Sequence, residues 1–477
     1  MKNYSPFERK RRLAARVALY GSFIFLMVVL VVASALLYPL FKKNAPPFWE
    51  SVDYSQVPEV QLLQEYVRID TSTDTGSELD GARFLAAKLE AAGIPVHIEQ
   101  LGDRQANLWA ILEGEDPRAL VLHNHIDVYT VVDPDKWDFP PFGGVIKPPY
   151  LYGRGAFDMK SVAIAQLEAL LAVAQSGKKP KRSIIFLATG SEEIGSELGT
   201  RRILDQHPEL ASRFWAVLTE GGIIEPLELK VIKYWGIEFA QKQFASAYAC
   251  SASRERLQEL REEILAAGDS VADLRLTPAA AAFAEAYAPS RTLEDFRRLL
   301  SDPQETIRQP AAFRRLPKYL QALFRDELVT FRVEEDPEGG FRMRLFFHLL
   351  AGSDLEEVRR RLLPDWMTHG VALVIEDPLG TSEASPLDHV VYRTLHGSLK
   401  AALPDARVGP VFLSWTATDS RFFRTLGIPS YGFSPFLIFA TDTYRVDTIN
   451  ERIGLPGFVE GVRIYKEVVQ TLANDIS

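Results

Sequence analysis

The sequence predicts an α/β protein in which a smaller domain interrupts the main domain and one transmembrane helix precedes both. Three observations support this. Short apolar segments alternate with Ala/Leu-rich segments of helical spacing over residues 59–232. Charged helical runs replace that pattern over residues 233–376, and the first pattern then returns over residues 377–477. A stretch of 25 uncharged residues lies near the amino terminus.

That uncharged stretch, residues 17–41, is long enough to cross a bilayer as a helix, which takes about 20 residues. Six basic residues precede it and only Lys42 and Lys43 follow it. By the positive-inside rule, residues 1–16 form a cytoplasmic tail and the chain after residue 41 is extracytoplasmic: periplasmic, extracellular or lumenal. The alternative is a cleaved signal peptide, whose apolar region would span only about 7–15 residues.

Composition excludes several classes of protein. The chain has a net charge of −9, although residues 1–44 are strongly basic, so the remainder is acidic and a poor binder of nucleic acid. Cys250 is the single cysteine. It therefore excludes an intramolecular disulfide and a Cys-rich zinc site, and stability must come from the core.

The main domain begins after a Pro-containing linker, residues 42–58. Its predicted strands span residues 106–113, 119–122, 183–188 and 215–218, and its predicted helices span residues 79–92 and 159–176. Gly93 and Gly177 stand where these helices would end.

Residues 233–376 predict an inserted domain. They combine helical runs at 254–267 and 355–363 with strand-like segments at 328–333 and 341–350. The chain then returns to the main domain with a helix at 389–403, a strand at 431–436 and a long helix from about residue 456 to residue 474. The main domain is therefore predicted to be discontinuous.

Potential metal ligands stand at the ends of four strand-like segments, where an open α/β sheet places its ligand crevice. They are His125 and Asp127, Asp158, Glu192 and Glu193, and Glu220. Singly, each has an ordinary explanation: a satisfied core pair, a local ion pair or helix N-cap, or a solvated surface. Because the chain has only eight histidines, the occurrence of four such groups at strand ends predicts a metal site.

The chemistry of these residues suits zinc and tolerates cobalt or manganese, because it combines an imidazole with carboxylates. Asp127 is predicted to accept the second ring N–H of His125. Asp158 could bridge two cations about 3.5–4 Å apart. Of the adjacent Glu192 and Glu193, one could bind metal while the other takes a proton from the attacking water.

Several longer segments of the chain carry a recognisable pattern. They are HNHIDVYTVVDPDKWDFPPFGG, LYGRGAFDMKS, ATGSEEIGSELGT, LTEGG and TDSRFFRTLGIPSYGFSPF. In order and spacing they resemble the zinc aminoacylase and carboxypeptidase family, and within it the carboxypeptidase S-like branch, over residues 55–235 and 380–477. The resemblance implies a catalytic domain built on a mixed or parallel sheet flanked by helices, with the insert as an α+β lid and dimerisation domain.

The resemblance also implies roles for individual residues. One metal would be held by His125, Asp158 and Glu220, and a second by Asp158 and Glu193. Glu192 would be the general base, with Asp127 behind His125. Two zinc ions and a possible homodimer follow from the same resemblance.

The chain departs from the family pattern at three places. Asp447 stands where the family has a last histidine ligand, so it is either an oxygen ligand favouring manganese or cobalt in the second site, or a surface residue beside Arg445. Residues 245–253 lack the family's lid histidine, which supplies an oxyanion donor. His348 aligns with the arginine that the family uses for the substrate carboxylate.

These features predict a membrane-anchored hydrolase that cleaves the amide bond of a peptide or an N-acyl amino acid. Arg421 is either a clamp for the substrate carboxylate or a partner of Asp419 or another acid. The altered lid leaves open a catalytically impaired, metal-containing binding protein. A soluble cytoplasmic peptidase would require residues 17–41 to be a core helix.

Overall fold

The computed structural model describes residues 52–474 except for residues 223, 228–230, 268–272, 292–293, 363–369, 376–379, 381–382, 437–441 and 443–444. The predicted cytoplasmic tail and the predicted transmembrane helix at residues 17–41 lie outside the described residues. Among the helices that are described, none is both long and apolar enough to cross a membrane.

The largest unit is a nine-stranded mixed sheet. Its strands are β1 (Val96–Gln100), β2 (Ala106–Leu112), β3 (Asp116–His125), β6 (Arg182–Thr189), β7 (Phe214–Thr219), β8 (Ile224–Leu227), β9 (Val231–Gln241), β14 (Val408–Leu413) and β15 (Ser430–Gly432). They run in the order β1-β2-β6-β3-β7-β15-β9-β14, with β8 beside β9. β3 lies between β6 and β7 and is parallel to both. The prediction of an α/β fold with a mixed sheet is confirmed.

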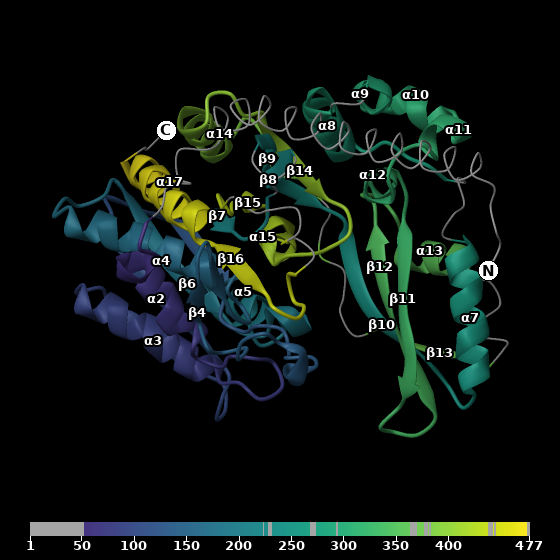
Figure 1. Ribbon diagram of the computed structural model, residues 1–477, viewed down its shortest axis with the longest axis horizontal. Helices are drawn as coiled ribbons and strands as arrows, with labels where there is room; N and C mark the ends of the chain where they lie inside the picture. Colours follow the sequence, from purple (N-terminus) through teal and green to yellow (C-terminus); the bar gives the residue numbers. More distant parts are fainter. Residues whose placement is uncertain are drawn as a thin grey trace, which may run out of the picture.

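Side chains alternate between the two faces of the sheet along each strand, and both faces carry apolar residues. Helices therefore cover both faces. From β3, Leu120 and Leu122 join the core under α2 (Pro58–Val67), α3 (Glu78–Ala91), α4 (Lys160–Gln175), α14 (Val390–Ala402) and α17 (Leu455–Asn474). Ala119 and Val121 point the other way, to α5 (Thr200–Gln206), α6 (Pro208–Ala211) and α15 (Ser420–Thr425). α17, the last helix, lies along α4 and also contacts α2, so the last described helix packs beside one of the first (Figure 1).

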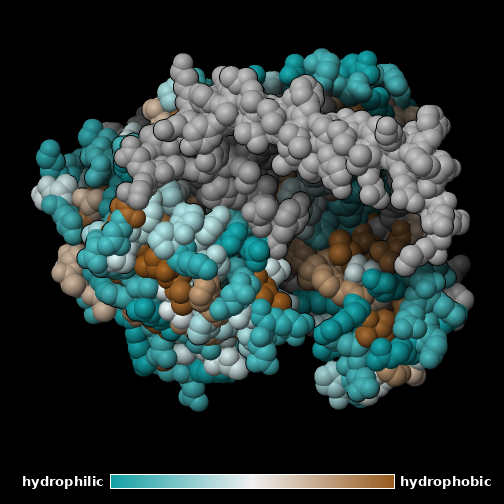
Figure 2. Space-filling view, viewed as in Figure 1, coloured by the Kyte–Doolittle hydropathy of each residue, from teal (hydrophilic) through white to brown (hydrophobic). Residues whose placement is uncertain are grey.

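A four-stranded sheet forms the second body, which is drawn on the right in Figure 1. Its strands are β10 (Gln243–Ser251), β11 (Glu327–Glu335), β12 (Phe341–Leu349) and β13 (Ala372–Ile375), in the order β11-β12-β10-β13. Helices α7 (Arg254–Ala267) and α13 (Leu355–Leu362) cover one face and share a separate core with Ala247, Leu345 and Phe347. In the space-filling view a notch separates this body from the larger one (Figure 2).

The chain leaves the main sheet later than the predicted boundary at residue 233. β9 pairs with β14, with Val408 opposite Trp235 and Leu413 opposite Gln241. Ile237 is fully buried in the main core, which explains why this apolar stretch stays in the first sheet. The chain enters the second sheet only at Gln243.

A group of helices inside the predicted insert also differs from expectation. These are α8 (Pro278–Tyr287), α9 (Glu294–Ser301), α10 (Pro303–Arg308), α11 (Pro310–Phe313) and α12 (Lys318–Gln321). Phe283, Leu300 and Leu320 belong to the core of the nine-stranded sheet rather than to that of the second body. The ring of Tyr234 in β9 lies 5.1 Å from that of Tyr287, so α8 packs directly on the main sheet. Periodicity marks such helices but does not say which core they join.

A small sheet brings two distant segments together. It consists of β4 (Val145–Lys147), β5 (Tyr150–Tyr152) and β16 (Arg452–Gly454). β16 pairs antiparallel with β5, with Arg452 opposite Tyr152. This register places the segment around residue 450 next to the segment that leads into α4.

Most predicted helices and strands lie within about two residues of those observed, as expected of sequence-based boundaries. Gly93 and Gly177 have φ values of +76° and +67°, the left-handed conformation that ends a helix. The strand predicted at residues 431–436 is shorter than expected. It spans only Ser430–Gly432, and the chain then leaves the sheet.

Candidate metal centre

Two predicted ligands and the predicted general base come from the carboxyl ends of the neighbouring parallel strands β3, β6 and β7. His125 is the last residue of β3, and Glu220 directly follows β7. Glu192 opens the short 3-10 helix η4 (Glu192–Ile194), three residues after the end of β6. Because parallel strands end at one edge of a sheet, these side chains converge there.

Asp158 reaches the same place by another route, which corrects the expectation that it ends a strand of the sheet. It lies in the turn between β5 and α4, two residues before that helix begins. Its Oδ1 lies 3.1 Å from Nε2 of His125. The glycine-rich segment before α4 therefore carries the carboxylate to the sheet edge.

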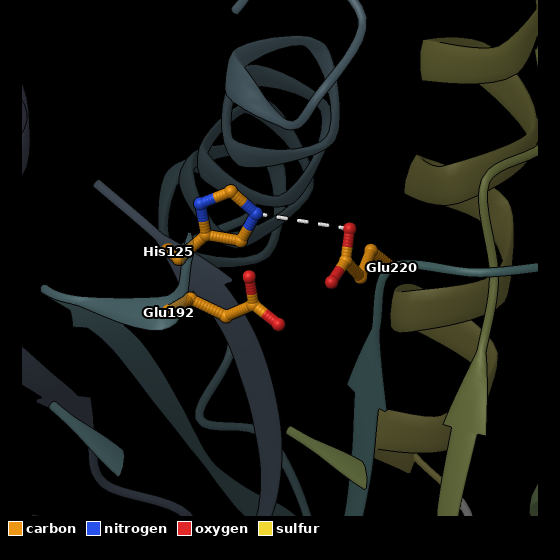
Figure 3. A group of neighbouring side chains, drawn as sticks. All are labelled: His125, Glu192 and Glu220. Atoms are coloured by element: carbon orange, nitrogen blue, oxygen red, sulfur yellow. Dashed lines mark ion pairs between the residues drawn. The ribbon is translucent and has the colours of Figure 1, made fainter. Parts of the chain in front are cut away.

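The ligand atoms form two groups that share the imidazole. Those of His125, Glu192 and Glu220 lie within 4.8 Å of one another, as do those of His125, Asp158 and Glu193. Figure 3 shows the first group: the imidazole faces the carboxylate of Glu220, and Glu192 points into the same space. The distance from Nε2 of His125 to Oε2 of Glu220 is 3.7 Å. The chain thus gathers all five predicted ligands except Asp447.

The orientation of His125 is set by main chain rather than by a carboxylate. Its Nδ1 lies 2.8 Å from the backbone oxygen of Asp127. A carbonyl oxygen can only accept a hydrogen bond, so Nδ1 carries the hydrogen. Nε2 then faces the carboxylates of Asp158 and Glu220 and is free to bind a metal ion. The predicted contact with the Asp127 carboxylate is longer, at 3.7 Å.

The carboxylate of Asp127 instead holds the loop after β6. It is fully buried and accepts the backbone N–H groups of Glu192 and Glu193, each at 3.0 Å. Asp127 therefore orients both glutamates, while its carbonyl orients His125. The hydrogen bond predicted between His125 and the Asp127 carboxylate is therefore replaced by one to the Asp127 backbone oxygen.

The centre concentrates buried negative charge. Burial and the nearby Asp158 raise the pKa of Glu220 to about 8. Burial and Glu220 raise the pKa of Glu192 well above its usual value, and burial and Asp447 do the same for Glu193. Burial lowers the pKa of His125, but the surrounding carboxylates outweigh burial and raise it.

Divalent cations fit this arrangement. The donors are one imidazole nitrogen and several carboxylate oxygens, a set that zinc accepts and that supplies the charge a cation needs. Oε1 of Glu193 is buried and has no hydrogen-bond partner among the described residues. Since a buried carboxylate oxygen without a partner is costly, a ligand for it is expected, and a metal ion satisfies it.

Asp447 lies at the margin of this centre and belongs to neither of the two groups. Burial, followed by the charges of Asp158 and Glu451, raises its pKa to about 8. Its Oδ1 lies 3.5 Å from Nη1 of Arg154. Asp447 is therefore electrostatically part of the site, and its role as a ligand stays a prediction.

Arg421 lies at the contact between the two bodies. Its guanidinium carbon is 4.6 Å from the ring centre of Phe422 and 5.2 Å from that of Phe244 in β10. Only 3% of the residue is exposed. The carboxylate of Asp419 accepts hydrogen bonds from the hydroxyl groups of Ser196 and Thr200.

His348 is buried in β12 of the second body, and its ring lies 5.3 Å from that of Phe244. Burial, with the charge of Lys242, lowers the pKa of His348 to about 3, so the ring is neutral. Residues 245–253, which lack the family's histidine, lie in and just beyond β10. A neutral imidazole is a weak substitute for an arginine that binds carboxylate.

Two buried glutamates at the site were missed from the sequence. Glu451 accepts the backbone N–H groups of Phe157 and Asp158. Glu78 accepts the backbone N–H of Ser191 at 3.0 Å, next to the metal-site glutamates. Glu451 lies four residues after Asp447, at a place where the family resemblance already drew attention, but Glu78 opens an ordinary amphipathic helix and carries no local signal.

Comparison with known proteins gives one family match and several relatives. The family described as Peptidase family M20/M25/M40 matches residues 121–471. A succinyl-diaminopimelate desuccinylase from Methylocella silvestris is 37% identical over 161 residues, which are 32% of this chain and 40% of the relative. This sequence match thus spans less than half of that relative's length.

Solved structures extend the likeness to nearly the whole described chain. An M20 family metallo-carboxypeptidase from Sulfolobus solfataricus has a TM-score of 0.65 at 16% identity, covering 87% of this chain and 99% of that one. Human carnosine dipeptidase 1 has a TM-score of 0.64 at 16% identity, covering 88% and 98%. At these identities the likeness shows the fold.

Proposed function

Because the chain belongs to peptidase family M20/M25/M40, whose members are metal-dependent hydrolases, we propose that it cleaves the amide bond of a peptide or an N-acyl amino acid. Enzymes of this family bind two metal ions, typically zinc. One observation carries the proposal: the ligand atoms of His125 gather with four carboxylates in two groups at one sheet edge, and Glu192 is among them.

In this proposal His125, Asp158 and Glu220 would hold one metal ion. Asp158 would be shared with a second ion, which Glu193 and Asp447 would also hold, with manganese or cobalt as alternatives to zinc there. When bound, such ions would supply Lewis-acid polarisation of the substrate carbonyl and lower the pKa of the attacking water. The Lewis-acid contribution would also offset the missing lid histidine.

Glu192 acts as the general base. Asp127 holds its backbone N–H, and burial with the neighbouring Glu220 raises its pKa, so its carboxylate readily takes a proton. It removes a proton from the attacking water and then passes that proton to the leaving amine. General acid–base groups of this kind contribute about 10²–10⁴-fold to rate.

The names of three relatives support small amide substrates for this chain. They are a desuccinylase, a carboxypeptidase and a dipeptidase. Arg421 is the proposed partner for a substrate carboxylate, because a guanidinium pairs bidentately with one. Membership of the carboxypeptidase S-like branch stays a prediction.

The proposal includes a location and a partner. Residues 17–41 would anchor the protein with its hydrolase domain outside the cytoplasm, and the four-stranded sheet would pair with that of a second copy. The supports are the charge asymmetry around the apolar stretch and the strands β11 and β13 at the edges of that sheet.

The test uses full-length protein purified in a mild detergent, with bound metal measured and amino acid release assayed on dipeptides and N-acyl amino acids. We expect two metal ions per chain and turnover, and a loss of about 10²–10⁴-fold in Glu192→Gln with its metal content unchanged. Activity indifferent to Glu192→Gln would overturn the mechanism.

A second candidate is a metal-containing binding protein for peptide-like ligands with impaired catalysis. The lack of a histidine in residues 245–253 favours it, because that donor would stabilise the oxyanion. The same assay decides between the two. Two bound metal ions with no turnover on any substrate would favour the binding protein.

A further inference from the structure

We propose that Glu451 is a positioning residue that, together with Arg154, holds the metal ligands Asp158 and Asp447 in place. The proposal rests on the metal centre of the proposed function. It concerns residues that do not themselves reach the metal ions. The argument depends on two contacts of Glu451 and on the sheet register that creates them.

The first contact is with the peptide groups that carry Asp158. Oε1 of Glu451 accepts the backbone N–H of Phe157 at 2.9 Å and that of Asp158 at 3.2 Å. The residue has no exposed surface. A fully buried carboxylate that bonds two successive N–H groups fixes the direction in which the Asp158 side chain leaves the main chain.

The second contact is with Arg154. Its Nη1 lies 2.6 Å from Oε2 of Glu451 and 3.5 Å from Oδ1 of Asp447. The guanidinium is also buried, donates to the backbone oxygen of Thr130 at 3.3 Å and lies 5.5 Å from the ring centre of Trp137. One planar cation therefore links Glu451 to Asp447, and its surroundings leave it little freedom.

The register of the small sheet brings these groups together. β16 pairs with β5, and the backbone N–H of Gly153 bonds the backbone oxygen of Glu451 at 3.0 Å. Glu451 and Asp158 are 293 positions apart in the chain. The pair of Glu451 and Arg154 therefore couples the loop before α4 to the loop that carries Asp447.

This arrangement has a measurable consequence for metal binding. Groups that orient metal ligands typically cost about 10–100-fold in metal affinity when they are replaced. In Glu451→Gln, the amide NH₂ would face either the N–H groups or the guanidinium, so one of the two contacts is lost. Both ligands then lose orientation although neither has been changed.

The experiment is a cobalt(II) titration of metal-free, full-length protein followed by visible absorption, which reports ligand geometry. We expect Glu451→Gln to bind cobalt about 10–100-fold more weakly, with an altered spectrum. Wild-type affinity and spectrum in this variant would overturn the proposal. A wild-type protein that binds no cobalt would instead overturn the proposed metal centre.

A matched control separates positioning from loss of a buried ion pair. Asp326 is 2% exposed at its side chain, accepts the backbone N–H of Leu350 at 2.8 Å and pairs with Arg361 at 2.8 Å. It belongs to the second body rather than to the metal centre. Asp326→Asn should lower thermal stability without changing cobalt affinity or spectrum.

A second variant keeps the proposal testable if Glu451→Gln does not fold. Arg154→Lys retains a positive charge but loses the planar guanidinium, whose Nη2 bonds Thr130 and so keeps Nη1 near both Glu451 and Asp447. We expect weaker binding of the second equivalent of cobalt and little change in the first. Unchanged binding of both equivalents would overturn the proposed link to Asp447.

Discussion

The carboxylate of Asp127 accepts the backbone N–H of Glu192 at 3.0 Å, so the segment that follows His125 also holds the proposed general base in place. The same carboxylate accepts the backbone N–H of Glu193. One buried side chain thus ties the ends of β3 and β6 together. This relationship makes the loop after β6 a defined part of the candidate metal centre.

Replacing Asp127 by asparagine should weaken this loop. The amide offers one acceptor oxygen, and its NH₂ would oppose the second backbone N–H. We expect a loss of about 10–100-fold in metal affinity or activity, measured as zinc content and kcat. Asp116→Asn, at the opposite end of β3, is the control and should leave both unchanged; equal effects of the two would contradict the role of Asp127.

Substituting Gly199 should destabilise the same loop by steric overlap. A Cβ at this position would lie 1.8 Å from the backbone oxygen of Gly190. We expect Gly199→Ala to lower the free energy of unfolding by about 1–3 kcal/mol, measured by thermal or urea denaturation. Gly397, in α14, has no atom within 4 Å of such a Cβ, so Gly397→Ala should be neutral or slightly stabilising.

Metal removal should destabilise the protein, and more so at higher pH. Burial and neighbouring carboxylates raise the pKa of Glu220 and that of Asp447 to about 8. Without metal, the folded state keeps protons that the unfolded chain releases, so stability falls as pH rises from about 4.5 to 8. Bound metal replaces those protons.

The measurement is the melting temperature with chelator and with zinc at pH 6 and pH 8. A zinc concentration that equals 100 times the Kd at pH 6, kept the same at both pH values, would add about 2.7 kcal/mol at pH 6. We expect the increase in melting temperature on adding zinc to be larger at pH 8. An increase that does not depend on pH would argue against buried carboxylates as the ligands.

His348 should make stability depend on pH through the second body. Burial and Lys242 lower its pKa to about 3, from 6.5 in an unfolded chain. Because only the unfolded state takes up the proton between these values, stability is complete above about pH 6.5 and is lost toward pH 3, by about 1.4 kcal/mol per unit.

His348→Phe removes this contribution and keeps a ring between Phe244 and Phe346. We therefore expect the variant to gain about 2 kcal/mol relative to wild type between pH 7 and pH 5. Urea denaturation at the two pH values measures the difference. Parallel pH profiles for the two proteins would show that His348 is not buried as a neutral ring.

Sequence reasoning located the strands and helices of the main domain because burial of one or both faces imposes a local apolar pattern. It selected His125, Asp158, Glu192, Glu193 and Glu220 because their residue types and places relative to those strands are also local features. The nearby placement of these five residues in the structure agrees with that selection.

Contacts between distant segments could not be read from the sequence. The pattern around residue 233 does not reveal that β9 pairs with β14, nor that α8 packs on the main sheet. Likewise, His-x-Asp spacing suggested a side-chain contact, whereas the turn after β3 presents the carbonyl of Asp127 to His125 and aims its carboxylate at the next loop.

The sequence by itself determined the α/β class, the positions of most elements and the residue types that gather at the sheet edge. Only the tertiary structure decided that Asp158 arrives from the turn before α4, and that Glu451, paired with Arg154, bonds its backbone from the far end of the chain. The physical reason is that strand register and helix packing depend on surfaces hundreds of residues apart, whereas amphipathic periodicity and ligand chemistry are properties of each segment alone.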